Sequence, residues 1–324
     1  MKVAVLGLGS IGRRHARCFQ EAGASSLVGM DPLEERRAQF LKDFDCLAVA
    51  SEVEALASGP DLVVVASPNA YHTRQALLAV KAGCAVFVEK PLGVDLRQAE
   101  ELASAVASGG NYFHMGSNWK FHPAFLRMKA LIDEGAIGTP TGGQVLAGQW
   151  LPDWHPWEDY RGMYAARLDL GGGAIFDTHE IDYLTWLLGP VVSFCGLKAR
   201  SGALEIETED VAACVLRFAN GALVSLLTDY IQRTSRRRYH LSGEGGTIEW
   251  DFHAEEITLC TPGARMSKRW AVGLANINDM YVAQARQVLD DIRVGRPSVT
   301  GIRHALEVLR IQEAWRAETA FDLR

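Results

Sequence analysis

The chain has 324 residues, of which 48% are hydrophobic and 22% charged, and its formal net charge is −6. This mildly acidic balance argues against a nucleic-acid or anionic-membrane partner, and the length predicts about two domains. No signal-peptide pattern opens the chain, and no apolar run approaches the ~20 residues of a membrane span. The six cysteines show no C-x-x-C spacing, so we expect reduced thiols, a cytoplasmic location and no metal site.

Short apolar runs alternate with amphipathic stretches in the first part of the chain. Strands are predicted at 2–7, 26–31, 46–50, 61–67, 84–90 and 111–116, and helices at 11–23, 32–44, 70–83 and 95–109. Strands that are apolar throughout and alternate with helices indicate a parallel sheet covered on both faces. We therefore predict an α/β Rossmann domain over residues 1–120.

The pattern changes after Trp119. A helix is predicted at 124–138, a strand at 141–151, an aromatic-rich loop at 152–167 and a mostly helical stretch at 171–189. Strands without intervening helices follow at 191–200, 210–219, 221–231, 236–243, 246–252 and 255–260, before closing helices near 277–293 and 301–318. Turn sequences at 220–223 and 243–247 favour hairpins. Residues 121–324 are therefore predicted to form an α+β domain with a large open antiparallel sheet.

A glycine motif follows the first predicted strand and opens the first helix. Gly7 permits a tight turn, Gly9 lets the backbone approach a pyrophosphate, and Gly12 allows close packing of helix on strand. The alternatives are a glycine-rich turn of an unrelated α/β protein and an adenosylmethionine-binding domain. The cofactor-binding residues predicted here are Gly7, Gly9, Ser10, Ile11 and Gly12.

Asp31 ends the second predicted strand, at roughly the ~20-residue offset expected for an acid that binds ribose hydroxyls. A carboxylate at this place repels a 2′-phosphate, so we expect NAD rather than NADP. Arg36 and Arg37 lie further along the next helix and are expected to face solvent.

Two further loops are predicted at the carboxyl ends of strands, where an open parallel sheet binds ligands. Ser67, Asn69 and His72 follow the fourth strand and are predicted to contact the cofactor, although the same residues would serve an ordinary turn and helix start.

Glu89 and Lys90 end the fifth strand, and Pro91 forces Lys90 toward an extended conformation. Both are predicted to lie beside the cofactor, and Lys90 is also the predicted catalytic and substrate-binding lysine. Its charge would stabilise a developing alkoxide. Taken alone, a lysine at a loop start is more often solvated.

His179 and Asp182 are spaced i, i+3, so a helix would place them on one face. A histidine can accept a proton from a hydroxyl, and a carboxylate such as Asp177 can fix its tautomer. The alternative is a helix start with satisfied polar groups. A zinc-protease motif is excluded because Tyr183 holds the position of its second histidine.

The aromatic loop offers Trp154, Tyr160 and Arg161 as a substrate wall, since rings stack on sugar C–H faces and an arginine binds anions. The alternative is a loop that packs its aromatic residues into its own core. The basic run 236–238 is predicted to be an exposed strand edge or loop face rather than a phosphate site.

These motifs together resemble the glucose–fructose oxidoreductase and inositol dehydrogenase family, Gfo/Idh/MocA. The resemblance rests on the stretches GLGSIGRRHA, ASPNAYH, EKPLG, FHPAFLRMKALIDEGAIG and GGGAIFDTHEIDYLTWLLG, which occur in this order. It implies a Rossmann domain followed by an open-faced sheet domain, with Lys90 and His179 as catalytic residues and Asp182 beside the substrate.

Two positions depart from the family pattern. Ile175 stands where the family has an acid, and Asp177 lies two residues before His179, so we expect Asp177 to keep the acid's role. Lys120 stands where the family often has an arginine, and we expect it to contact the substrate.

The resemblance implies an NAD-dependent oxidoreductase acting on a sugar, polyol or acidic sugar derivative, as a homodimer or homotetramer. Two alternatives stay open: a glycosidase or epimerase that uses bound NAD transiently, and a non-catalytic dinucleotide sensor.

Overall fold

The computed structural model describes residues 1–263 and 267–322. It divides into two compact units, each described by itself. The first comprises Met1–Phe121 and Asn276–Leu309, and the second comprises His122–Ala275 and the chain from Arg310 onward. Residues 276–309 therefore belong to the first unit although they follow most of the second in the sequence. The predicted boundary after residue 120 stays a prediction.

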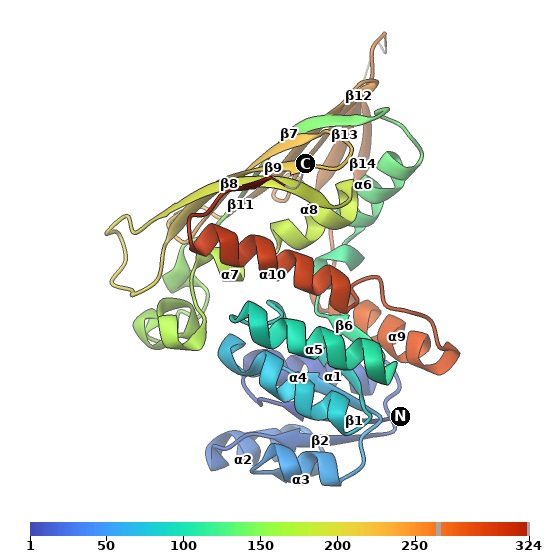
Figure 1. Cartoon of the computed structure of the whole chain (residues 1–324), viewed down its shortest axis with the longest axis vertical. Coiled ribbons are helices and arrows are strands. Elements are labelled where there is room, and N and C mark those ends of the chain that lie inside the picture. Colours follow the sequence, from blue (N-terminus) through green and yellow to red (C-terminus); the bar gives the residue numbers. More distant parts are fainter. Residues whose placement is uncertain (264–266, 323–324) are drawn as a thin grey trace. The chain divides into compact units, whose positions relative to one another are not determined.

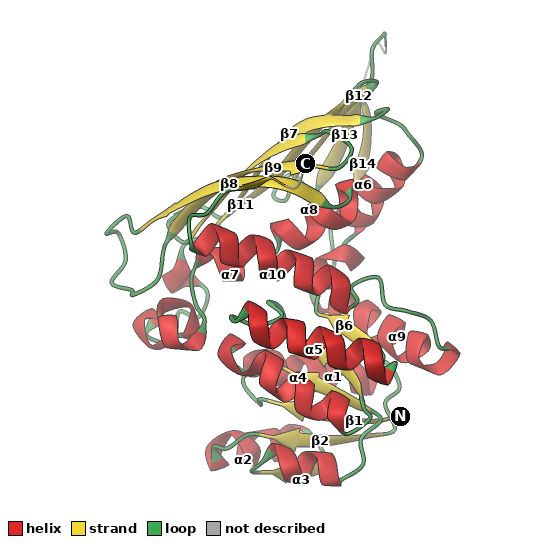
Figure 2. Ribbon diagram, viewed as in Figure 1, coloured by secondary structure: helices red, strands yellow, loops and turns green. Residues whose placement is uncertain are grey.

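The first unit is a parallel sheet with helices on both faces (Figures 1 and 2), as predicted. Its strands run in the order β3-β2-β1-β4-β5-β6, which is the order of a dinucleotide-binding fold. The strands are β1 Lys2–Leu6, β2 Ser26–Met30, β3 Leu47–Val49, β4 Leu62–Val65, β5 Ala85–Val88 and β6 Phe113–Met115. The helices are α1 Ser10–Glu21, α2 Glu34–Asp43, α3 Glu52–Ala57, α4 His72–Lys81, α5 Leu96–Gly109 and α9 Asn278–Val294. The sequence reading missed the short helix α3.

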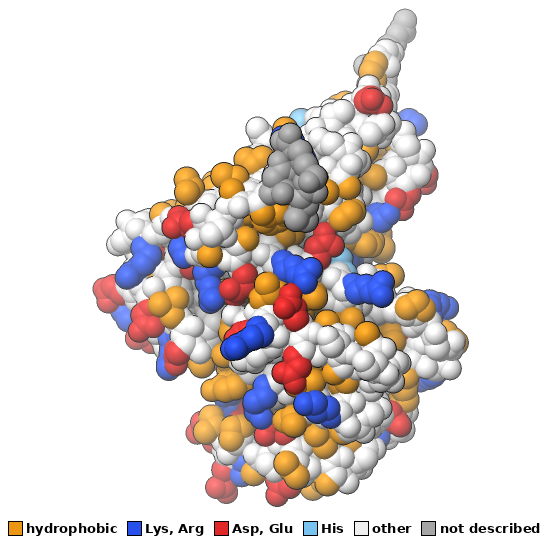
Figure 3. Space-filling model, viewed as in Figure 1, with side chains coloured by type: hydrophobic (Ala, Val, Ile, Leu, Met, Phe, Trp, Pro, Cys, Tyr) orange, Lys and Arg blue, Asp and Glu red, His pale blue; other side chains and the backbone are white. Residues whose placement is uncertain are grey.

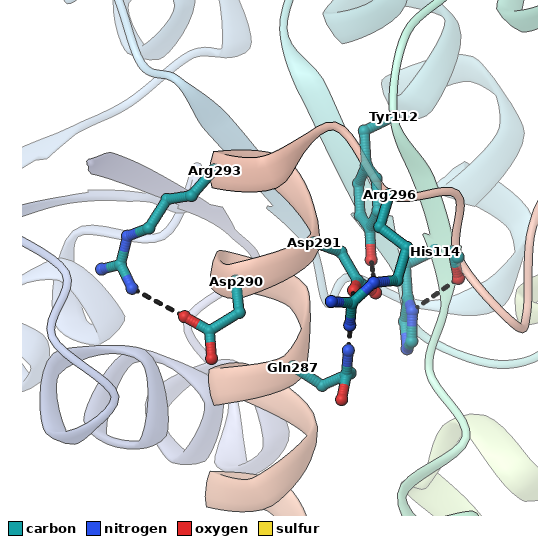
Figure 4. Close-up of polar contacts among 8 residues, drawn as sticks. Tyr112, His114, Gln287, Asp290, Asp291, Arg293 and Arg296 are labelled. Carbon is teal, nitrogen blue, oxygen red and sulfur yellow. Dashed lines mark hydrogen bonds and ion pairs between the residues drawn. The ribbon is translucent and has the colours of Figure 1, made fainter.

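Helix α9 packs its apolar side on the core of this unit, where Val288 and Leu289 join Phe19 and Phe87. A polar cluster fixes its last turns (Figure 4). The buried carboxylate of Asp291 accepts hydrogen bonds from Gln287 Nε2 at 2.7 Å, Arg296 Nη1 at 3.2 Å and Tyr112 Oη at 3.4 Å. Burial, followed by the charge of Asp291, raises the pKa of Tyr112 above its ordinary range.

The same cluster contains His114 of β6, whose Nδ1 lies 2.8 Å from Ser298 Oγ (Figure 4). Met115 N also donates to Thr300 O at 2.9 Å. The chain beyond α9 is therefore held to the edge of the sheet by backbone and side-chain bonds.

The second unit is built on a large mixed sheet. Among the described residues its strands run in the order β14-β13-β12-β11-β7-β10-β9-β8-β15. The strands are β7 Pro140–Gly148, β8 Val191–Ala199, β9 Val211–Phe218, β10 Leu223–Asp229, β11 Arg236–Gly243, β12 Gly246–Asp251, β13 Glu256–Cys260, β14 Lys268–Ala271 and β15 Phe321–Asp322. The two predicted hairpins connect β9 to β10 and β11 to β12. The sheet is mostly antiparallel, but β7 and β10 pair in parallel because the chain leaves β7 through a long helical excursion before it returns.

Helices cover one face of this sheet (Figure 2), and they are α6 Pro123–Asp133, α7 Ala174–Asp177, α8 Glu180–Leu188 and the last part of α10 Ile302–Arg316. Phe125 of α6 packs on Tyr183, Tyr239 and Trp250, with ring centroids 4.8–5.2 Å apart. The stretch 171–189 is mostly helical, as predicted, but the helix is interrupted, since α7 ends at Asp177 and α8 begins at Glu180.

The strands β9 and β10 alternate buried and exposed side chains, as expected where only one sheet face is covered. On the side of the molecule that Figure 3 shows, acidic and basic side chains are interspersed. None of the helices within residues 1–263 and 267–322 has the length and apolar character needed to cross a bilayer.

Candidate active site

The turn between β1 and α1 is shaped by three glycines. Gly7 has a φ of 90°, and a Cβ there would lie 2.7 Å from Ala66 O. A Cβ on Gly12 would lie 1.8 Å from Gly7 O, so only glycine allows this close packing of helix and turn. A Cβ on Gly9 would meet nothing within 4 Å, which leaves that side open for a ligand. With the N–H groups of the first turn of α1 beside it, the turn fits the pyrophosphate of a dinucleotide.

We expect Gly9→Ala to fold normally and to lose about tenfold in NAD affinity, ~1.4 kcal/mol, because the new methyl group occupies the open side of the turn. Calorimetric titration with NAD and thermal unfolding measure the two effects. Gly12→Ala is the matched comparison and should instead lower the free energy of unfolding by about 2 kcal/mol. Native NAD affinity in Gly9→Ala would contradict the assignment of this turn.

Asp31, at the end of β2, is 2% exposed. Its Oδ2 accepts a hydrogen bond from Leu8 N at 2.9 Å, and its Oδ1 accepts one from Leu33 N at 3.0 Å. These bonds hold the carboxylate against the glycine turn. An ionised carboxylate has about four acceptor sites, so Asp31 retains capacity for the hydroxyls of a ribose.

Of the two arginines after Asp31, Arg37 departs from the expectation that both face solvent, whereas Arg36 meets it. Arg37 is half-buried, and its Nη1 donates to Asp31 O at 2.8 Å and to Pro32 O at 2.9 Å. Arg36 is exposed, but its Nη1 lies 3.5 Å from Asp31 Oδ2. Arg36 therefore balances the charge of the Asp31 carboxylate, and Arg37 fixes the backbone of the loop that follows β2.

His72 joins two loops at the carboxyl edge of the sheet. Its Nδ1 lies 2.7 Å from Pro91 O and its Nε2 lies 2.8 Å from Ser67 O, and the side chain is almost fully buried. Burial lowers the pKa of His72, while the contacts with the two carbonyl groups oppose this shift. These contacts give His72 a positioning role. Asn69, in the intervening turn, is also buried.

Glu89 ends the neighbouring strand and pairs with His15 of α1 through its Oε1. Its Oε2 accepts a hydrogen bond from Lys90 N at 3.0 Å. Burial alone would raise the pKa of Glu89, but the bond and charge of His15 and the charge and N–H of Lys90 lower it below its ordinary value. An ionised Glu89 thus fixes the backbone from which Lys90 extends, and His15 is a residue that sequence reasoning missed.

Lys120 is 3% exposed and follows β6 in the turn Asn118–Phe121. Its Nζ lies 3.3 Å from Nε2 of His304, a residue of α10 that belongs to the first unit. The ammonium group is the donor if the imidazole is neutral. No local sequence signal indicates this pairing, because 184 residues separate the two partners.

Strands β1, β2, β4 and β5 are parallel, so their carboxyl ends meet at one edge of the sheet. The predicted residues that this edge brings together are Gly7, Gly9, Ser10, Ile11, Gly12, Asp31, Ser67, Asn69, Glu89 and Lys90.

In the second unit His179 lies in the break between α7 and α8 and is half-buried. Its Nδ1 lies 2.9 Å from the hydroxyl of Tyr183, and the two rings stack with centroids 5.6 Å apart. Asp182, in the first turn of α8, is 5% exposed.

Asp177 accepts a hydrogen bond from Tyr164 Oη at 2.7 Å and another from Tyr230 Oη. It is 8% exposed. Burial, followed by the charge of Asp177, raises the pKa of Tyr230 well above its ordinary value, so the tyrosine remains a donor. Asp177 therefore ties the aromatic loop to β10, and a catalytic role for it stays a prediction.

Glu180 and Arg237 form a buried ion pair, with Arg237 Nε 2.9 Å from Glu180 Oε1. Glu180 is fully buried, and its Oε2 also accepts from Thr178 Oγ1 at 2.8 Å and His179 N at 3.0 Å. The sequence prediction for the basic run was wrong at this position, since Arg237 faces inward. Arg238 is exposed, as expected, and pairs with Asp251 of β12, but β11 is an interior strand of the sheet rather than an edge.

The aromatic loop packs largely on itself. Trp154 and Tyr160 lie against a small core that contains Leu151, and Trp154 meets Tyr230 edge-on at 5.3 Å. Arg161 is exposed, and it donates to Glu205 Oε2 at 2.9 Å and to Asp159 Oδ1 at 3.1 Å. Substrate contacts for Trp154, Tyr160 and Arg161 stay predictions.

The sheet order and the glycine turn define a dinucleotide-binding protein. Residues 1–117 match the family model described as "Oxidoreductase family, NAD-binding Rossmann fold", and residues 125–249 match "GFO/IDH/MocA C-terminal domain". The chain therefore belongs to the GFO/IDH/MocA family of oxidoreductases. This makes it an NAD(P)-dependent dehydrogenase acting on CH–OH groups.

Two curated relatives show how far the similarity extends. A 1-carboxy-3-chloro-3,4-dihydroxycyclohexa-1,5-diene dehydrogenase of Comamonas testosteroni is 30% identical over 70% of this chain and 57% of its own length. A myo-inositol 2-dehydrogenase of Thermotoga maritima is 25% identical over 92% of this chain and 90% of its own length.

Among solved structures, levoglucosan dehydrogenase in complex with NADH and levoglucosan shares the fold. The TM-score is 0.89 over 100% of this chain and 99% of that chain, at 18% identity.

Proposed function

We propose that the protein is an NAD-dependent dehydrogenase that oxidises a C–OH group of a sugar, polyol or acidic sugar derivative, or reduces the corresponding carbonyl. The observation that carries this proposal is the shared edge of the first sheet, where the glycine turn, Asp31 and Lys90 follow parallel strands. The named activities of the relatives, on myo-inositol and on levoglucosan, support the substrate class.

In this proposal, separate residues of the chain bind the cofactor, act on the reacting oxygen and contact the substrate. The glycine turn binds the pyrophosphate and Asp31 binds the adenosine ribose. When bound, the nicotinamide accepts or supplies the hydride. Lys90 holds the reacting oxygen and stabilises its negative charge, and His179 forms a second hydrogen bond to that oxygen. Lys120, Asp182 and the aromatic loop contribute substrate contacts.

NAD is preferred over NADP in this proposal because the carboxylate of Asp31 repels a 2′-phosphate. Arg36 weakens that repulsion, since its guanidinium lies 3.5 Å from Asp31 Oδ2. We therefore expect a preference for NAD rather than complete exclusion of NADP.

A substrate screen tests the function. Sugars, polyols and sugar acids are each incubated with NAD and with NADP, while NADH or NADPH absorbance is followed and products are identified by mass spectrometry. Net NADH formation with one of these alcohols supports the proposal. Product formed without net NADH would favour the transient use of bound NAD instead, and no product from any of these classes would contradict both.

The uncovered face of the second sheet supports a homodimer or homotetramer. A cavity of about 940 Å³ lies on this face, lined by Leu197, Val215 and Leu227 among others. These three side chains are 69%, 46% and 37% exposed, an unusual density of apolar surface for a monomer. The six cysteines are all free, which fits the proposed cytoplasmic location.

We expect light scattering to give at least twice the chain mass of 35.5 kDa. The double variant Leu197→Glu, Val215→Glu should lower the mass to that of the single chain, because it places charges on the apolar face. Val53→Glu is the control, since Val53 is 76% exposed in the first unit. A monomeric native protein would contradict the proposed assembly.

A further inference from the structure

The ring of His179 is held by a second ring one helical turn further on. Tyr183 is fully buried, stacks on His179 with an interplanar angle of 10°, and places its hydroxyl 2.9 Å from His179 Nδ1. The stacking fixes the plane of the imidazole, and the hydroxyl fixes which ring nitrogen faces Tyr183. Any chemistry of His179 with a substrate therefore passes through Nε2.

The direction of the hydrogen bond between these two residues follows from the surroundings of the tyrosine. Within residues 1–263 and 267–322, Nδ1 of His179 is the one hydrogen-bond partner of the Tyr183 hydroxyl. If Nδ1 carried a proton and donated it, the phenolic hydrogen would be buried without an acceptor, at a cost of about 1–3 kcal/mol. If the hydroxyl donates instead, both groups are satisfied.

Tyr183 also keeps its proton. Burial, followed by the negative charge of Asp182, raises the pKa of Tyr183 well above its ordinary value, although Arg237 opposes this shift. The hydroxyl is therefore a donor at neutral pH, and Nδ1 of His179 is its acceptor.

The backbone of His179 is fixed as well. The buried carboxylate of Glu180 accepts the His179 N–H at 3.0 Å and is itself held by Thr178 Oγ1 at 2.8 Å and Arg237 Nε at 2.9 Å. The imidazole is thus constrained at its backbone, its ring plane and one nitrogen, and it cannot exchange its two nitrogens by a ring flip without breaking the bond to Tyr183.

We propose that Tyr183 is a positioning residue that sets neutral His179 in the tautomer with its proton on Nε2. This inference rests on the proposed function and says which residue donates a hydrogen bond to the reacting oxygen and which residue exchanges a proton with it. A neutral imidazole with a proton on Nε2 donates a hydrogen bond to the reacting oxygen and does not accept a proton there. In oxidation, the substrate O–H proton is therefore assigned to Lys90 rather than to His179, and the C–H hydrogen leaves with its electron pair as the hydride that the nicotinamide, when bound, accepts. In reduction, Lys90 returns the proton to the oxygen.

The tautomer is measured directly by ¹⁵N NMR of the histidine-labelled full chain at a pH where the imidazole is neutral, with His179→Gln to assign the signals. We expect a protonated Nε2 and an unprotonated Nδ1 in the native protein. Tyr183→Phe keeps the stacked ring and removes the hydroxyl, so the two tautomers should become mixed. Tyr239→Phe is the matched control, because it removes another buried hydroxyl, one that lies 3.4 Å from Glu180 Oε1 instead of touching the imidazole.

Steady-state kinetics give the second measurement. Tyr183→Phe should lower kcat about tenfold with little change in KM, since the loss of one hydrogen bond that sets a tautomer acts on the chemical step. A native signal with the proton on Nδ1 would overturn the proposal without any variant. A folded Tyr183→Phe protein with an unchanged tautomer would overturn it too. The NMR measurement needs no substrate, so its result is independent of whether the proposed dehydrogenase activity is found.

Discussion

Replacement of Lys90 by methionine is expected to lower kcat about a thousandfold while NAD affinity changes less than about twofold. Methionine fills a similar volume but can neither bind the reacting oxygen nor move a proton. The backbone of residue 90 should stay in place, because its N–H bond to Glu89 Oε2 does not depend on the side chain. Initial rates with the substrate found by the screen, together with calorimetric titration of NAD, measure the two quantities.

The matched control for this variant is Lys81→Met. Lys81 lies in the same unit at the end of α4, is 62% exposed and is 3.6 Å from Glu101 Oε1. We expect native turnover from it, because a surface ion pair contributes less than about 1 kcal/mol and lies outside the site. Native kcat in Lys90→Met would remove Lys90 from the reaction.

Arg237→Leu is expected to lower the free energy of unfolding by about 3 kcal/mol. The change leaves the Glu180 carboxylate fully buried without its cationic partner, and the energy of an uncompensated buried charge is high. Because Glu180 accepts the His179 N–H, the same variant should also reduce turnover. Urea denaturation of the full chain measures the first effect.

Arg238→Leu is the control for Arg237→Leu. Arg238 is 56% exposed and pairs with Asp251 on the neighbouring strand β12, so Arg238→Leu should change the unfolding free energy by less than about 1 kcal/mol. Equal destabilisation by the two substitutions would show that Arg237 does not act through a buried pair.

The architecture of the first unit could be predicted from sequence because its signals are local. Four apolar residues in succession, as at 62–65, require a strand covered on both faces, and glycines at 7, 9 and 12 require a turn at a helix start. The position of Lys90 followed from Pro91 and the end of β5. These features depend on neighbours within a few residues, which a single sequence displays.

The remaining parts of the site depend on partners far apart in the chain. His15 meets Glu89 across 74 residues, and Arg237 meets Glu180 only because β11 lies beside β7 under α8. The interruption at His179 was also missed, since the apolar spacing of 171–189 continues through it. Local periodicity reports burial, and burial alone does not reveal which polar groups meet inside.

The two carbonyl contacts of His72 have a consequence for engineering. The loops after β4 and β5 are separated in sequence, yet one buried ring links Ser67 to Pro91. Insertion of a single residue in either loop would move one carbonyl away from its nitrogen and displace the other loop as well. Residues 67–72 and 89–91 therefore have to be transferred together, or not at all, when the carboxyl edge of the first sheet is rebuilt on another scaffold.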